Sequence, residues 1–310
     1  MEPMTRRSFL TLSLRLATVM GLGASAAPAL ADALERIVRG RAPTLWLQGQ
    51  CCSGCSVSLL DSEPVGADAL LTRDIALAFH QTLSGATGHQ AVETVDRAIA
   101  AGGFLLVVEG SVPMDMPQAC FFGEEAFGSQ LLRAARAAKA VVAVGTCATS
   151  GGIPAAEGNP TGAISVPEFL RRSGLSVPCI SIPGCPAHPD WIVGTLTHVL
   201  GFGLPPLDDR GRPKAFFDKL VHDQCPRFAD YEREVFAEKF SDDGCLFRLG
   251  CAGPITKADC NLRLWNGGTS SCIKAGAPCI GCAWEGFAAK RDFPFYLKNG
   301  QLQPKPKGHA

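Results

Sequence analysis

The 310-residue sequence has no excess of charge of either sign. Its 29 Lys and Arg residues balance its 29 Asp and Glu residues, so the formal net charge is zero. Proteins that bind nucleic acid or an anionic membrane by long-range attraction rely on a basic excess, and this chain has none. The sequence also lacks an internal repeat, a low-complexity tract, a phosphate-binding loop and a Ser-His-Asp order. Its function must therefore come from another kind of chemistry.

Long apolar runs are absent beyond the first thirty residues, and a spanning helix needs about 20 such residues. Arg6 and Arg7 precede a mostly apolar stretch that ends in a small-x-small cleavage pattern at residues 29–31. This arrangement predicts a twin-arginine signal peptide over residues 1–31; a membrane anchor is the alternative. We expect a periplasmic mature chain without an anchor of its own, which can still join the membrane through partner proteins.

Cysteine, in contrast, is abundant, with 14 residues that are clustered along the chain. In an exported protein such thiols could form disulfides. Twin-arginine export, however, carries proteins across the membrane already folded and suits chains whose cofactor is inserted in the cytoplasm. The cysteines therefore indicate cofactor ligation.

Four short apolar runs predict buried strands, at residues 44–47, 104–108, 140–144 and 177–182. Helical stretches at residues 90–100 and 130–138 lie between them, a pattern typical of an α/β doubly wound parallel sheet. Ligands bind such sheets beyond the carboxyl ends of the strands. Three of the runs lead into turns that carry Cys52 and Cys55, then Cys147, then Cys185. We expect these four thiols to meet at one edge of the sheet.

A second ligand series follows a predicted helix at residues 191–200 and a Gly-Pro boundary at residues 203–206. Apart from an amphipathic candidate helix at residues 228–240, this part is expected to form around its ligated centres. Its metal-binding residues are His222, Cys225, Cys245, Cys251, Cys260, Cys272, Cys279 and Cys282. Both structural zinc and iron-sulfur clusters accept these donors, and spacing alone does not separate the two. The four-thiol site at the sheet edge favours clusters.

Seven strings, in order along the chain, carry a family resemblance. They are Trp46-Leu47-Gln48-Gly49 with Cys52-Ser53-Gly54-Cys55-Ser56, Val108-Glu109-Gly110, Gly145-Thr146-Cys147-Ala148, Pro183-Gly184-Cys185-Pro186, His222-x-x-Cys225-Pro226, Leu249-Gly250-Cys251-x-Gly253-Pro254 and Pro278-Cys279-Ile280-Gly281-Cys282. With these strings the chain resembles the small subunit of nickel-iron hydrogenases.

The resemblance implies a flavodoxin-like domain at residues 32–204 and a smaller, loop-rich iron-sulfur domain at residues 205–310. It also implies an electron-transfer subunit without catalytic residues, because the Ni-Fe centre that performs H2 = 2 H+ + 2 e- lies on a partner large subunit. The expected electron acceptor is a multihaem cytochrome c or a separate membrane electron-transfer protein.

The resemblance further implies three clusters and their ligands. Cys52, Cys55, Cys147 and Cys185 would hold a proximal 4Fe-4S cluster; His222, Cys225, Cys245 and Cys251 a distal 4Fe-4S cluster; and Cys260, Cys279 and Cys282 a medial cluster. Many family members have Pro where this chain has Cys272, and their medial cluster is 3Fe-4S. A fourth thiolate at Cys272 favours a 4Fe-4S medial cluster, as in nickel-iron-selenium relatives; a free thiol is the alternative.

Other residues are assigned weaker roles. Cys179 is interpreted as a small buried hydrophobe and Cys51 as a non-ligand. Cys120 is interpreted as lying near the position of an extra thiol in oxygen-tolerant relatives. Glu109 is expected to be a capping or a solvated carboxylate, with a proton or subunit contact as the alternative. His188 is expected to be a turn residue, with a docking-surface residue as the alternative.

Three alternative functions stay open at this point. One is a complex I-like iron-sulfur subunit, which would share the first domain. A second is a cytoplasmic hydrogen sensor, which the expected signal peptide opposes. The third is a secreted zinc- or disulfide-stabilised binding protein, in which the same thiols would have other roles.

Overall fold

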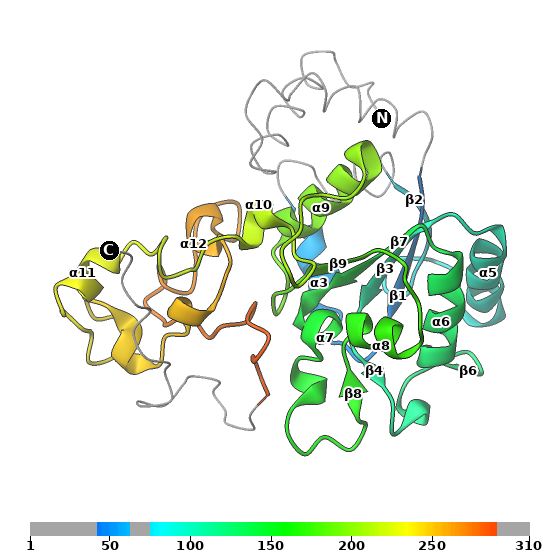
Figure 1. Cartoon of the computed structure of the whole chain (residues 1–310), viewed down its shortest axis with the longest axis horizontal. Coiled ribbons are helices and arrows are strands. Elements are labelled where there is room, and N and C mark those ends of the chain that lie inside the picture. The colour runs from blue at the N-terminus through cyan, green and yellow to red at the C-terminus, as the bar shows by residue number, and fades with distance from the viewer. Residues whose placement is uncertain (1–41, 63–74, 290–310) are drawn as a thin grey trace, which may run out of the picture.

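A five-stranded parallel sheet lies among the helices on the right of Figure 1. The computed structural model describes residues 42–62 and 75–289. The strands, in their order across the sheet, are β2 (Ile75–His80), β1 (Ala42–Gln48), β3 (Leu105–Glu109), β7 (Ala140–Val144) and β9 (Cys179–Ile182). All four neighbouring pairs are parallel. This is the flavodoxin-like doubly wound order, so the predicted fold class is confirmed.

Helices cover both faces of this sheet. They are α3 (Gly54–Leu60), α5 (Gly88–Ala101), α6 (Phe127–Ala137), α7 (Gly145–Ser150), α8 (Val166–Arg172) and α9 (Pro189–Phe202). Alternate residues of each strand point to opposite faces. Trp46, Val107 and Val142 belong to the apolar core that contains residues of α3 and α9. Leu45, Val108 and their neighbours belong to the core that contains residues of α5, α6 and α8.

Short strands and single turns connect the main elements. Two antiparallel pairs are formed by β4 (Val112–Pro113) with β8 (Ala163–Ile164), and by β5 (Phe121–Phe122) with β6 (Glu125–Ala126). The short 3-10 helices are η3 (Pro117–Ala119), η4 (Ile153–Ala155), η5 (Leu246–Leu249) and η6 (Gly253–Ile255).

The part of the chain after α9 is rich in loops. Its α-helices are α10 (Lys214–Phe217), α11 (Phe228–Glu232) and α12 (Cys260–Arg263), each of only one turn or little more. The helix expected over residues 228–240 is wrong beyond Glu232. Glu234 adopts a left-handed conformation with φ 58°, and Phe236 turns to contact Tyr231 at 6.1 Å between ring centroids. The apolar residues of the pattern form an aromatic cluster here instead of one helix face.

This loop-rich part shares an apolar core with the α9 side of the sheet. Phe217 packs edge-on against Trp191 of α9 with 4.9 Å between ring centroids, and Val221 and Ile273 belong to the same core.

The division into residues 32–204 and 205–310 stays a prediction. The signal expected at residues 1–31 lies outside the described residues. Within residues 42–62 and 75–289 no helix has the length and apolar character needed to cross a membrane.

Candidate metal centres

The structure brings the first four predicted thiols together at the carboxyl edge of the sheet. After β1, Cys52 lies just before α3 and Cys55 in its first turn, whereas Cys147 lies in α7 after β7 and Cys185 follows β9. Cys147 is close enough to Cys52 and Cys185 for each to raise its pKa, and Cys55 is affected likewise by Cys147 and Cys185. The parallel topology therefore places these thiols as the sequence predicts. We call them the first thiol group.

Glycines keep the backbone close to these sulfurs. Gly145 has φ 85°, and a Cβ atom there would collide with the Sγ atom of Cys55. A Cβ atom on Gly152 would lie 2.9 Å from the Sγ atom of Cys147. Both positions therefore require a residue without a side chain.

Glu109 lies at the end of β3, directly beside the first thiol group. Its side chain is buried, and its Oε1 atom accepts hydrogen bonds from the backbone N–H groups of Cys55 at 3.0 Å and Ser56 at 3.4 Å. Glu109 therefore caps the start of α3, and the solvated alternative is wrong. Its charge contributes to the raised pKa of Cys55, after burial as the main cause.

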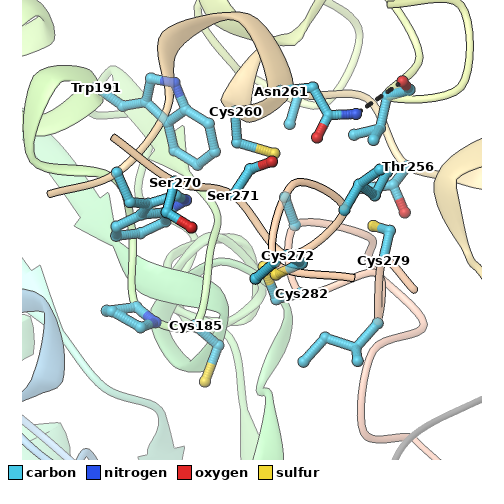
Figure 2. Close-up of a pocket in the computed structure, with 18 of the residues that line it drawn as sticks. Cys185, Trp191, Thr256, Cys260, Asn261, Ser270, Ser271, Cys272, Cys279 and Cys282 are labelled. Carbon is cyan, nitrogen blue, oxygen red and sulfur yellow. Dashed lines mark hydrogen bonds between the residues drawn. The ribbon is translucent and has the colours of Figure 1, made fainter. Parts of the chain in front are cut away.

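Four thiols of the second series line one cavity of about 430 Å³ (Figure 2). They are Cys260, Cys272, Cys279 and Cys282. Cys272 and Cys282 both lie close enough to Cys260 to raise its pKa, so Cys272 stands among the other three although its side chain is solvent-exposed. We call these four residues the second thiol group. The cavity exceeds the roughly 30 Å³ share of one water molecule by more than tenfold, so it has room for a group much larger than a single ion.

A third set, the His-thiol group, consists of His222, Cys225, Cys245 and Cys251, which line one smaller pocket. His222 is buried and does not lie on the solvated surface. Its ring packs against Tyr231 and Phe228, with centroids 4.5 and 5.1 Å away. Burial lowers the pKa of His222 and favours the neutral imidazole, the form that binds metals.

The second thiol group connects the other two. Cys282 lies close enough to Cys185 for that thiol to raise its pKa, and the backbone N–H of Cys185 stabilises the Cys282 thiolate. At the other end, Cys251 lies close enough to Cys279 to add to the rise in its pKa that burial causes. The Ala252 N–H donates to the Cys279 carbonyl at 2.7 Å. In Figure 2 the sulfur of Cys185 points away from Cys272 and Cys282. The three groups thus follow one another in a row.

The donor chemistry of this row fits iron-sulfur clusters. Burial, reinforced by neighbouring thiols, raises the pKa of Cys147 to about 12 and that of Cys282 to about 11. Several adjacent thiols cannot all ionise without compensating positive charge, which cluster iron supplies when it binds thiolates. Across the described ranges, no group of three or more His, Cys, Asp or Glu side chains has the arrangement that would hold a single metal ion.

The remaining predicted residues lie outside these groups. Cys179 packs half-buried against the core, and burial raises its pKa to about 12, as expected for a small apolar side chain. Cys51 borders the first thiol group, and Cys120 contributes slightly to its raised pKa. His188, expected to be a turn residue, is a buried N-cap of α9 that accepts from the Asp190 N–H at 3.1 Å.

Sequence reasoning missed the polar residues behind Glu109. Gln48, Ser56 and His80 are buried and hydrogen-bonded to the carboxylate or to one another. Gln48 and Ser56 belong to the strings that carry the family resemblance, so the sequence could have identified them as candidate site residues. No comparable signal marks His80.

Two family models match the chain, one in each part. Residues 217–296 match the model for the C-terminal part of the NiFe/NiFeSe hydrogenase small subunit. Residues 52–199 match the model described as the NADH ubiquinone oxidoreductase, 20 Kd subunit. The first part thus has the likeness to complex I expected from the sequence, and the second part belongs with hydrogenases.

Known relatives match over both parts of the chain. The chain is 40% identical to the periplasmic [NiFeSe] hydrogenase small subunit of Desulfomicrobium baculatum, over 95% of this chain and 99% of that protein. It is also 40% identical to the uptake hydrogenase small subunit of Afipia carboxidovorans, over 92% of this chain and 79% of the relative.

Solved structures show the same likeness. A chain of the H2-activated [NiFeSe] hydrogenase of Desulfomicrobium baculatum matches with a TM-score of 0.78 and 40% identity, over 83% of this chain and 99% of that one. A chain of the [NiFeSe] hydrogenase of Desulfovibrio vulgaris Hildenborough matches with a TM-score of 0.76 and 43% identity, over 83% of this chain and 98% of that one. The chain therefore belongs to the family of nickel-iron hydrogenase small subunits.

Proposed function

We propose that this chain conducts electrons through three iron-sulfur clusters between the Ni-Fe centre of a large subunit and an external acceptor. The observation that supports this proposal is the row of three donor groups, joined through Cys282 with Cys185 and through Cys279 with Cys251. The complex would catalyse H2 = 2 H+ + 2 e-, with the bond-breaking chemistry on the large subunit and electron transfer on this chain.

The ligand assignment follows the three groups. The first thiol group would hold the proximal 4Fe-4S cluster, the His-thiol group the distal 4Fe-4S cluster, and the second thiol group the medial cluster. Bound clusters exchange single electrons at potentials set by ligands, charge, hydrogen bonds and exposure. The protein's part is to bury the donors, exclude water and hold the three groups in sequence. Neutral His222 in place of a thiolate removes one negative charge from the distal site and favours a higher potential there.

A 4Fe-4S medial cluster is the form that we propose. Cys272 supports it because this thiol stands with Cys260 and Cys282 at the same cavity. With three thiolates, only a 3Fe-4S cluster would have every iron bound to a cysteine.

Electrons would enter where α3 presents an apolar surface. Val57 and Leu60 of this helix are 60% and 51% exposed, beside the exposed Cys52 of the first thiol group. A hydrogenase large subunit packed over this surface would bury these side chains and bring the Ni-Fe centre close to the proximal cluster. The two proteins would form a heterodimer.

Electrons would leave near His222. Phe228, Val235 and Phe240 are exposed in this region, and seven acidic residues outnumber four basic ones between residues 222 and 248. This surface suits an acceptor with a basic face, either a multihaem cytochrome c or a separate membrane electron-transfer protein. The relative named as a periplasmic hydrogenase small subunit supports a periplasmic location. The pair Arg6-Arg7 and the apolar stretch after it support export by the twin-arginine route.

Analysis of the anaerobically purified heterodimer tests the proposal. We expect roughly twelve acid-labile sulfides, four for each cluster, and an oxidised-state EPR spectrum that no 3Fe-4S signal dominates. Replacing Cys272→Ala should convert the medial cluster and produce a strong oxidised 3Fe-4S signal. The matched control Cys179→Ala, on β9, should leave the spectrum unchanged.

Each contradictory result has its own meaning. A wild-type protein that contains zinc in place of iron and sulfide would refute cluster-based electron transfer altogether. A wild-type spectrum dominated by a 3Fe-4S signal would refute only the four-thiolate medial site.

A further inference from the structure

Glu109 carries a buried negative charge beside the first thiol group. Its side chain is only 2% exposed and accepts four hydrogen bonds. Oε1 receives the backbone N–H groups of Cys55 and Ser56, and Oε2 receives the Ser56 hydroxyl and, at 3.1 Å, the Nε2 atom of Gln48. All four donors are neutral. Hydrogen bonds from neutral donors do not cancel the charge of a carboxylate.

The residues behind the carboxylate form a chain of hydrogen bonds that ends on it. The backbone N–H of Thr82 donates to Nδ1 of His80 at 3.0 Å, so the neutral ring carries its proton on Nε2. Nε2 of His80 lies 3.2 Å from the Ser56 hydroxyl oxygen, which also receives Gln48 Nε2 at 2.9 Å. Both lone pairs of the Ser56 oxygen are therefore occupied, and its single proton is left to point at Glu109.

This charge opposes further negative charge on the neighbouring thiol group. The Oε1 atom of Glu109 lies 3.0 Å from the backbone nitrogen of Cys55, one of the residues of that group. Adding an electron to a cluster bound at Cys55 would meet the same repulsion. The carboxylate also occupies the N–H groups of Cys55 and Ser56, which could otherwise donate to cluster sulfur, and hydrogen bonds to the sulfurs help to set cluster potentials.

We propose that Glu109 lowers the reduction potential of the cluster held by the first thiol group, with Gln48, Ser56 and His80 orienting its carboxylate. The inference rests on the function proposed above. A lower potential at this cluster favours electron flow onward to the second thiol group, in the direction of hydrogen oxidation.

Redox titration of the proximal cluster by EPR tests the assignment in the assembled heterodimer. Replacing Glu109→Gln removes the charge with little change in shape. It should favour the reduced cluster by tenfold or more, a positive shift of 59 mV for each tenfold in a one-electron couple. The conservative Glu109→Asp should keep the potential near that of the wild type. The matched control Glu93→Gln removes an exposed carboxylate from α5 and should leave the potential unchanged.

A second variant decides the question if Glu109→Gln fails to assemble its cluster. Replacing Gln48→Lys would place an ammonium group against the carboxylate and neutralise it in place, so the potential should again rise. Proximal potentials that stay at the wild-type value in the variants that load their clusters would overturn the assignment. Wild-type protein without any cluster signal would instead refute the proposed function and leave Glu109 without this role.

Discussion

At the scale of single residues, the buried His80 couples stability to pH. Its side chain is fully buried, and burial lowers its pKa from the ordinary 6.5 to about 4. The folded chain therefore keeps this ring neutral where the unfolded chain binds a proton. Above pH 6.5 the ring is neutral in both the folded and the unfolded chain, and His80 causes no loss of stability. As the pH falls from 6.5 toward 4, the free energy of unfolding decreases by up to roughly 3 kcal/mol, because only the unfolded chain binds the proton.

Denaturant unfolding between pH 4 and pH 7 checks this expectation. The variant His80→Asn should be less stable at neutral pH and should lose less of its remaining stability on acidification. The control His89→Asn changes an exposed histidine of α5 and should follow the wild-type profile. Parallel pH profiles for the wild type and His80→Asn would contradict the assignment.

Sequence predicts residues of this site unequally. Cys52, Cys147 and Cys185 were predictable because each follows an apolar run, and parallel strands bring such positions to one edge. His80 was not, because its role depends on the pairing of β2 with β1, which places its ring 4.9 Å from Trp46. Such a contact between distant segments has no local signature.

At the scale of elements, the turn after β7 leaves space for a thiol of the first thiol group. Gly145 starts α7 with φ 85°, and its missing side chain makes room for Cys55. Gly174 also has a positive φ, 68°, but no atom lies within 4 Å of the Cβ position there. A comparison of Ala substitutions at Gly145 and Gly174 therefore distinguishes the effect of backbone strain from that of steric contact with the Cys55 thiol.

Replacing each glycine by Ala should give different results. Gly174→Ala should cost about 1 kcal/mol of unfolding free energy, from the left-handed backbone alone, and should retain its iron. Gly145→Ala carries the same strain and also displaces Cys55, so the proximal cluster should be lost. Iron analysis with EPR of the purified variants distinguishes them; a full proximal signal in Gly145→Ala would show that the turn tolerates a side chain.

Elements are predictable where local pattern and tertiary packing agree. The runs at residues 104–108 and 140–144 correspond to β3 and β7 because strands covered on both faces consist of continuous apolar residues. Strand β2 was missed, although it completes the sheet edge. The helix expected at residues 228–240 ends at Glu232, because Phe228, Tyr231 and Phe236 pack around His222 and its neighbours.

At the scale of the whole molecule, the two parts of the chain differ in what stabilises them: apolar packing in the sheet, and the proposed metal ligation in the part after α9. The sheet has alternate residues buried in two apolar cores. The part after α9 has short helices, and the second thiol group and the His-thiol group line pockets within it. Local stability in a protein follows buried apolar contact and cross-links, so the two parts should respond differently when their metal is removed.

Hydrogen exchange of the heterodimer before and after anaerobic removal of iron tests this difference. Amides at residues 220–289 should lose protection by tenfold or more, which corresponds to about 1.4 kcal/mol. Amides of β3 and β7 should keep most of theirs, because their apolar packing needs no cluster. Because Phe217 and Val221 share a core with Trp191, the loss should fade toward α9 instead of stopping sharply at one residue. An equal loss in strands and loops would mean that the clusters stabilise the chain as one cooperative unit.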